Sequence, residues 1–137
     1  MATKIFVNLP VQDLKKSMSF YSALGYKNNP QYTDETAACM IISEEIYTML
    51  LTHEKFKEFS PNPICDAKKS TEVLLCISCE SRAEVDEQVR KAVAAGGRTY
   101  KEPKDYGFMY FQSYQDLDGH CWELMYMDPS AANGQAD

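Results

Sequence analysis

The sequence has little positive charge and few histidines. It has 14 lysines and arginines and 20 aspartates and glutamates, which give a formal net charge of −6. Its two histidines are His53 and His120. Binders of nucleic acids and of anionic membranes carry a basic face, so we expect neither partner. The charge mildly favours neutral or cationic small ligands.

Long apolar runs are also missing. No stretch approaches the roughly 18 residues that cross a membrane, and the first residues are strand-like rather than the apolar core of a signal peptide. The five cysteines are an odd number, so we expect reduced thiols in a cytoplasmic protein. Cys76 and Cys79 match C-x-x-C, but residues three apart in a strand point to opposite faces, which argues against a metal or redox site.

The first half of the chain predicts one strand, one helix and three further strands. Residues 3–9 are strand-like, and Pro10 is expected to end that strand. Asp13 is a candidate N-cap for a helix over 14–24, which Gly25 ends. The three strands that follow are expected at 26–32, 36–43 and 46–52.

The second half repeats this order. Residues 53–70 form the connection, and 53–59 could make a short amphipathic helix. A strand over 72–78 precedes a capping box from Ser81 to Glu84, which predicts the start of the second long helix. The last three strands are expected at 98–103, 107–114 and 120–127.

These elements predict an α+β fold made of two βαβββ modules. Each module alone would leave one sheet face bare, so packing of the modules is expected to enclose a cupped cavity. The boundaries follow from the elements: a single domain over 1–137, a first module over 3–52, a connecting loop over 53–70, a second module over 71–127 and a flexible tail over 128–137.

Two motifs resemble those of a known superfamily. They are PVQDLKKSMSFYSALG at 10–25 and DLDGHCWEL at 116–124, where Leu117 replaces the usual proline. Together they are similar to motifs of the vicinal oxygen chelate superfamily, which contains glyoxalase, extradiol dioxygenases and the bleomycin and fosfomycin resistance proteins. The resemblance implies a cupped, incompletely closed eight-stranded mixed sheet and a homodimer. It does not specify one activity, because this fold hosts several chemistries.

The resemblance also implies four positions for metal ligands, one on the first and one on the fourth strand of each module. Matched to this chain, they are Phe6, Leu50, Leu74 and Glu123, and only Glu123 can bind a divalent metal. A slip of register would bring in Asn8 but no cluster of histidines and carboxylates. We therefore predict no metal and no other cofactor; a divalent metal enters only if the position matching is wrong.

Glu123 is the residue that needs an explanation, because an ionised carboxylate in an apolar strand must be paired, hydrogen-bonded or solvated. It could be bonded to a hydroxyl or water, it could anchor a cationic ligand, or it could be a catalytic general base. The predicted ligand-binding residues are Phe6, Asn8, Leu50, Thr52, Leu74, Cys76, Cys121, Glu123 and Met125.

Three functions remain open at this point. The first is a protein that binds a small organic molecule without metal, similar to the bleomycin-resistance branch. The second is a metal-dependent glyoxalase-type lyase or extradiol-type dioxygenase, which the missing ligands oppose. The third is a module without a ligand, whose own aromatic side chains fill the cavity.

Overall fold

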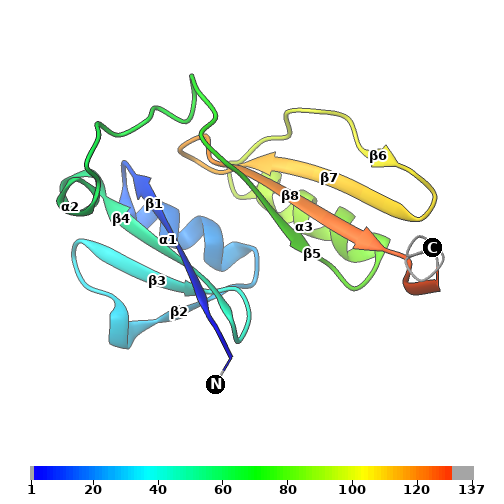
Figure 1. Ribbon diagram of the computed structural model, residues 1–137, viewed down its shortest axis with the longest axis horizontal. Helices are drawn as coiled ribbons and strands as arrows, with labels where there is room; N and C mark the ends of the chain where they lie inside the picture. Colours follow the sequence, from blue (N-terminus) through cyan, green and yellow to red (C-terminus); the bar gives the residue numbers. More distant parts are fainter. Residues whose placement is uncertain (1, 131–137) are drawn as a thin grey trace. The chain divides into compact units, whose positions relative to one another are not determined.

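The computed structural model describes residues 2–130 of the chain and divides into two compact units, Met1–Ser70 and Thr71–Asp137. Each unit has the order strand, long helix and three strands, so the predicted α+β fold of two βαβββ modules is confirmed (Figure 1). The strands form two four-stranded mixed sheets, one in each unit. Residues 131–137 of the predicted tail lie outside the described residues. In the described part, no helix is long and apolar enough to cross a membrane.

The first unit is built on a sheet with the strand order β1-β4-β3-β2. Strands β1 and β4 are parallel, and the other neighbours are antiparallel. The elements are β1 (Ile5–Val11), α1 (Leu14–Ala23), β2 (Lys27–Asn29), the 3-10 helix η1 (Pro30–Tyr32), β3 (Ala37–Ile41), β4 (Ile46–Thr52) and α2 (His53–Phe59).

The ends of α1 form for the local reasons that the sequence suggests. The Asp13 carboxylate accepts a hydrogen bond from the Lys16 amide at 3.1 Å, and Gly25 has a φ of 99°, which favours glycine. Pro10 does not end β1 as we predicted, because the strand continues to Val11. Since β1 is the edge strand of its sheet, one side of its backbone pairs with no other strand of that sheet among the described residues, and a missing amide hydrogen is tolerated there.

The second unit repeats the topology with the strand order β5-β8-β7-β6. Ser81 caps its helix by accepting from the Glu84 amide at 3.0 Å. The predicted strand over 98–103 is largely irregular. Arg98 forms an isolated bridge to Gln115, and the strand that follows, β6, has only the two residues Lys104–Asp105. The elements are β5 (Leu74–Ser78), α3 (Arg82–Ala94), β6 (Lys104–Asp105), β7 (Met109–Gln115) and β8 (Cys121–Met127).

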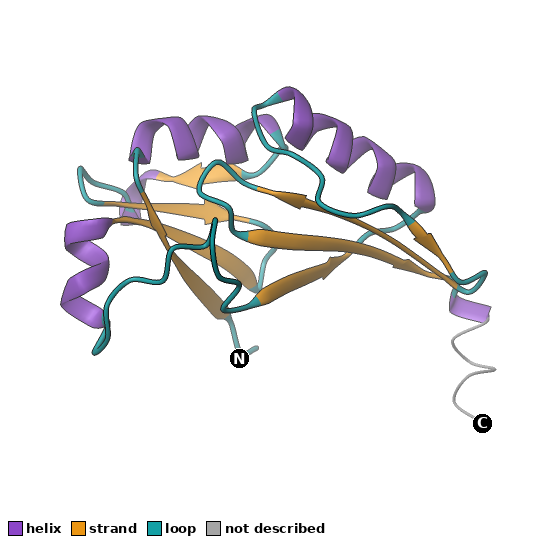
Figure 2. Cartoon of the chain, turned by 90° about the horizontal axis from the view of Figure 1, so that it is seen from above, coloured by secondary structure: helices purple, strands orange, loops and turns teal. Residues whose placement is uncertain are grey.

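In each unit the long helix covers one face of its own sheet (Figure 2). Helix α1 packs against β3 and β4, and α3 packs against β7 and β8. We call the opposite face the open face of that unit. Because side chains alternate along a strand and residues paired across a ladder share a face, the strand register assigns every strand residue to the helix side or to the open face.

Candidate functional site

Two of the predicted ligand-binding residues lie away from the open face. Leu50 pairs with Leu9 and Ala38, and all three are at most 2 % exposed on the side that α1 covers. Leu50 therefore belongs to the helix-side core, and its prediction as a cavity wall is wrong. The Thr52 hydroxyl instead caps α2, where it accepts a hydrogen bond from the Lys55 amide at 3.2 Å.

Phe6 and Asn8 do lie on the open face of the first unit. Phe6 pairs with Tyr47, and their rings stack with centroids 4.7 Å apart and an angle of 11° between the planes. Asn8 pairs with Met49, and its side-chain amide donates to the Phe6 carbonyl at 3.2 Å. The face thus presents an aromatic pair beside a flexible thioether.

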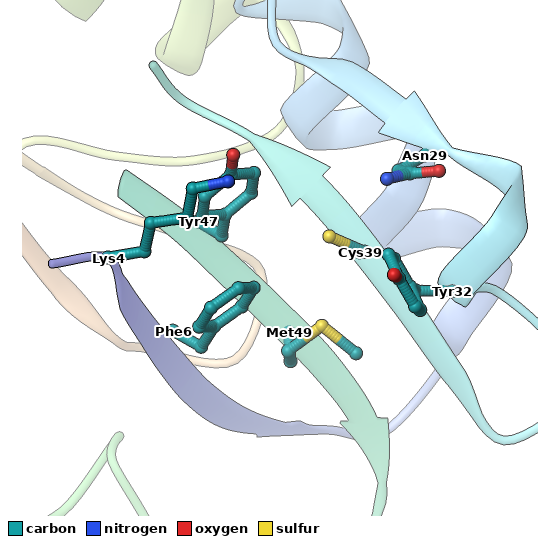
Figure 3. Close-up of a pocket in the computed structure, with 7 residues that line it drawn as sticks. All are labelled: Lys4, Phe6, Asn29, Tyr32, Cys39, Tyr47 and Met49. Atoms are coloured by element: carbon teal, nitrogen blue, oxygen red, sulfur yellow. The ribbon is translucent and has the colours of Figure 1, made fainter. Parts of the chain in front are cut away.

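A pocket of about 430 Å³ is hollowed into this open face. Figure 3 shows Phe6, Tyr47 and Lys4 on one side of it, with Met49 between them and the residues of the other side. All of its walls come from the first unit. The lining residues are Lys4, Phe6, Asn29, Tyr32, Cys39, Tyr47 and Met49.

The pocket is apolar apart from a few polar groups at its edges. The Lys4 ammonium lies 5.7 Å from the centroid of the Tyr47 ring, a cation–π arrangement. The Tyr47 hydroxyl donates to the Glu44 carbonyl at 2.8 Å, which holds the ring in place. Cys39 is 1 % exposed, and burial raises the pKa of its thiol, so it lines the pocket as a neutral group.

In the second unit, the predicted residues share one face. Leu74 pairs with Cys121, and Cys76 pairs with Glu123, so all four point to the open face together with Met125, which pairs with Ser78. Leu74 and Cys76 are exposed on the edge strand, whereas Cys121 is buried. The structure therefore brings these five side chains onto one surface, with Glu123 near its middle.

Glu123 has a partner that the sequence did not reveal. Its carboxylate accepts a hydrogen bond from the Lys101 ammonium at 2.6 Å, and the two side chains are 16 % and 44 % exposed. The hydrogen bond to Glu123 raises the pKa of Lys101. Because Oε2 of Glu123 already binds the Lys101 ammonium, Glu123 is poorly suited both to anchor a cationic ligand and to act as a general base.

The residue before Lys101 covers the neighbouring part of the same face. The Tyr100 hydroxyl is buried beside Ser113 and Cys121, and burial raises the pKa of Tyr100 to about 12. Ser113 pairs with Glu123 and is 1 % exposed. The Tyr100 and Ser113 hydroxyls lie close enough to interact, but neither makes a hydrogen bond of good geometry with a described residue. Tyr100 and Lys101 therefore cover part of the open face next to Glu123.

The environment of the Cys76–Cys79 pair raises the pKa of both thiols, which disfavours the thiolate form at neutral pH. Cys76 is exposed at its surface but partly desolvated by its neighbours; this desolvation, followed by the charge of Glu123, raises the pKa of its thiol. Burial and the carboxylate of Glu84 raise the pKa of Cys79 to about 12. Thiols with raised pKa values are weak nucleophiles and weak metal ligands at neutral pH.

The strand register also corrects the metal-ligand positions. Asp13 and Ser81 cap the two equivalent helices, and the strands before them place Asn8 and Cys76 at equivalent positions. Asn8 pairs with Met49, and Cys76 pairs with Glu123. The counterpart of Glu123 in the first unit is therefore Met49 and not Leu50.

The residues at these positions do not fit a divalent metal ion. Phe6 and Leu74 carry no donor atom, Met49 offers only a thioether, and Glu123 is paired with Lys101. In the described range 2–130, no three His, Cys, Asp or Glu side chains gather closely enough to hold a metal.

Sequence reasoning missed most of the pocket. It found Phe6, but not Tyr47 and Met49, because matching by motif chose the wrong alternate set on β4. Tyr32 lies on η1, within a segment that we predicted to be a strand. An apolar alternation of Tyr47, Met49 and Leu51 was the available signal, but the register that selects it is a property of the folded sheet.

Comparisons with known proteins agree with this fold. A family model described as bleomycin resistance protein-like N-terminal matches residues 3–43. A hypothetical protein from S. aureus has a structure with a TM-score of 0.77 and 30 % identity, over 92 % of this chain and 94 % of that one. No protein with a curated description matches the chain.

Two structures of lower identity show the same fold. A glyoxalase/bleomycin resistance protein/dioxygenase family enzyme from Burkholderia phytofirmans has a TM-score of 0.75 and 18 % identity, over 92 % of this chain and 99 % of that chain. The fosfomycin resistance protein FosX from Listeria monocytogenes has a TM-score of 0.66 and 18 % identity, over 92 % and 93 %. At this identity the likeness concerns the fold alone.

Proposed function

The chain belongs to the glyoxalase/bleomycin resistance/dioxygenase (vicinal oxygen chelate) superfamily, and on that premise we propose that it binds a small organic molecule without metal. The observation that carries the proposal is the pocket of about 430 Å³ on the open face of the first unit. Small-molecule sites have volumes of roughly 300–1,000 Å³ and are mostly apolar with a few polar groups. The pocket has both properties.

The residues at the pocket favour binding over a covalent reaction. Cys39, the one thiol in its lining, has a pKa raised by burial, and the Tyr47 hydroxyl is bonded to a backbone carbonyl. Phe6 and Tyr32 are 48 % and 59 % exposed, a large apolar surface for single side chains. A ligand that covered them would remove this surface from water, at roughly 25 cal/mol per Å².

The test is a nuclear magnetic resonance titration of the full chain with a library of aromatic and aliphatic fragments. We expect shift changes at the amides of Phe6, Tyr47 and Met49, and we expect Met49→Arg to abolish them by filling the pocket. Met18→Arg on α1 is the matched control, since α1 covers the other face of the sheet, and it should leave binding intact. If no fragment shifts these amides, or if both variants lose binding equally, the proposal fails.

The alternative function is a metal-dependent lyase or dioxygenase. The superfamily includes such enzymes, but the side chains of Phe6, Met49 and Leu74 offer no good ligand for a divalent metal, which argues against a metal-dependent enzyme here. Elemental analysis of protein loaded with nickel, zinc, manganese or iron separates the two functions. About one ion per chain, lost on Glu123→Ala, would favour the enzyme.

We also propose that the protein is a homodimer, as the resemblance implies. Ile5 and Leu74 are each 55 % exposed on the edge strands β1 and β5, and exposed apolar edges favour association. Light scattering should give twice the chain mass of 15.6 kDa. A concentration-independent mass of one chain would exclude the dimer.

A further inference from the structure

The open face of the first unit has an unusual charge for this protein. The chain as a whole has a formal net charge of −6, yet this face carries lysine and no carboxylate among its strand residues. Lys4 lies at the pocket and Lys27 lies on the outer strand of the same face. The strand side chains on this face are Phe6, Asn8, Pro10, Lys27, Asn29, Ala37, Cys39, Ile41, Tyr47, Met49 and Leu51.

Lys4 retains its capacity to bind an anion. Its ammonium lies over the Tyr47 ring, and it makes no ion pair with any described residue, whereas Lys101 of the second unit is bonded to Glu123. A cation held over a ring face keeps its hydrogen-bond donors for another group. An ammonium at the edge of an apolar pocket favours a ligand with a negative charge at one end.

The rest of the pocket has the shape of a site for a flat ring. Phe6 and Tyr47 lie nearly parallel on one side, and Tyr32 lies on the other side with Met49 between them (Figure 3). Aromatic rings pack on such faces by stacking or by edge contacts, and a thioether adapts to a ring that lies against it. These contacts favour an aromatic ligand over an aliphatic one.

We propose that the ligand of this pocket is a planar aromatic carboxylate, held by its charge at Lys4 and by its ring against Phe6 and Met49. The inference rests on the proposed function, because it names the chemical class of the molecule bound at the same pocket. It also reverses the ligand charge that Glu123 suggested from sequence. The anion is selected by Lys4, and the ring is selected by the aromatic walls.

A series of three probes of one shape and different charge tests the inference. The probes are 2-naphthoate, the neutral 2-naphthamide and the cationic 2-naphthylmethylammonium, each titrated calorimetrically into the full chain. We expect 2-naphthoate to bind about tenfold more tightly than the amide, since one charge-assisted contact at a partly exposed site is worth roughly that factor. The cationic probe should bind most weakly, and added salt should weaken 2-naphthoate alone.

Lys4→Met then assigns the selectivity to one residue. We expect it to weaken 2-naphthoate about tenfold and to leave 2-naphthamide within about twofold, because the ring contacts remain. Lys16→Met is the matched control: it removes the same charge from α1, on the other side of the sheet, and should leave both affinities within about twofold.

The outcomes separate the two proposals. Two results would mean that the pocket binds molecules without selecting an anion: 2-naphthamide binding as tightly as 2-naphthoate, or Lys16→Met weakening 2-naphthoate as much as Lys4→Met does. In either case the inference is wrong and the proposed function stands. If fragments bind at Phe6 and Met49 but none of the naphthyl probes does, the ligand class is wrong. If neither the fragments nor the probes bind there, the proposed function itself is wrong.

Discussion

The two units share one topology and differ in what their open faces offer to a ligand. In the first unit, Phe6 is 48 % exposed beside a pocket, and Lys4 has no carboxylate partner among the described residues. In the second unit, Glu123 is bonded to Lys101, and Ser113 is buried beside Tyr100. The repeated fold therefore supplies two equivalent surfaces, of which one is available and one is largely occupied by the chain itself.

The connection after the long helix causes this difference. In the first unit, α1 ends at Ala23 and β2 begins at Lys27. In the second unit, α3 ends at Ala94 and β6 begins at Lys104, so the connection is longer and contributes Tyr100 and Lys101 to the open face. Loops, more than the elements they join, set the function of a duplicated scaffold.

The largest expected effect separates the two faces of the first sheet. Leu50→Ala should lower the free energy of unfolding by about 2–5 kcal/mol, because it leaves a cavity in the core under α1. Met49→Ala should cost less than about half of that, because its side chain borders an open pocket. Urea denaturation measures both values.

The loss of ligand binding should rank Leu50→Ala and Met49→Ala in the opposite order to the loss of stability. Met49→Ala should weaken fragment binding at Phe6 and Tyr47, whereas folded Leu50→Ala should retain it. A larger loss of stability for Met49→Ala than for Leu50→Ala would mean that the register of β4, and with it the comparison of the two faces, is wrong.

The second prediction compares buried hydroxyls in the two units. Thr48 is fully buried, and its hydroxyl donates to the Val7 carbonyl at 3.0 Å, so Thr48→Val should destabilise the protein by about 1 kcal/mol. The Ser113 hydroxyl is buried beside Tyr100 without a hydrogen bond of good geometry among the described residues, so Ser113→Ala should stabilise the protein by about 1 kcal/mol. Thermal or urea unfolding gives the signs; a loss of stability for Ser113→Ala would show that Tyr100 and Ser113 bond each other.

The local features of this fold could be predicted from the sequence. The structure confirms the helix caps at Asp13 and Ser81 and the shared face of Cys121, Glu123 and Met125. Each of these features depends only on neighbours within a few residues along the chain. The apolar patterns gave the order of the elements for the same reason. Fold class follows from such local signals once a module repeats.

The features that decide the site could not be predicted in this way. A slip of one residue exchanges the two faces of a strand, so motif matching placed Leu50 where the sheet places Met49. The pairing of Lys101 with Glu123 joins residues from an irregular segment and a strand, and no local pattern encodes it. Both the placement of Met49 at the pocket and the pairing of Lys101 with Glu123 are set by tertiary contacts between segments distant in the sequence.

The third prediction measures how strongly the second unit occupies its own open face. A double-mutant cycle of Lys101→Met and Glu123→Gln should give a coupling of roughly 0.2–1 kcal/mol, because the lysine is partly exposed and water screens the pair. Urea unfolding of the four proteins at pH 8 supplies the values. A coupling near zero would mean that Glu123 is available to a ligand after all, which would remove the contrast between the units.

The smallest effect is the pH dependence of the same pair. The hydrogen bond to Glu123 raises the pKa of Lys101 in the folded state, so the folded protein holds this proton more tightly than the unfolded chain does. The stabilisation is therefore complete below the unfolded lysine pKa of about 10.4 and is lost as the pH rises through the higher folded value. The difference in unfolding free energy between the wild type and Lys101→Met, at most about 1 kcal/mol after screening, should shrink from pH 9 to pH 11. A difference for Lys101→Met that stayed constant or grew over this pH range would mean that Lys101 is not held as an ammonium by Glu123.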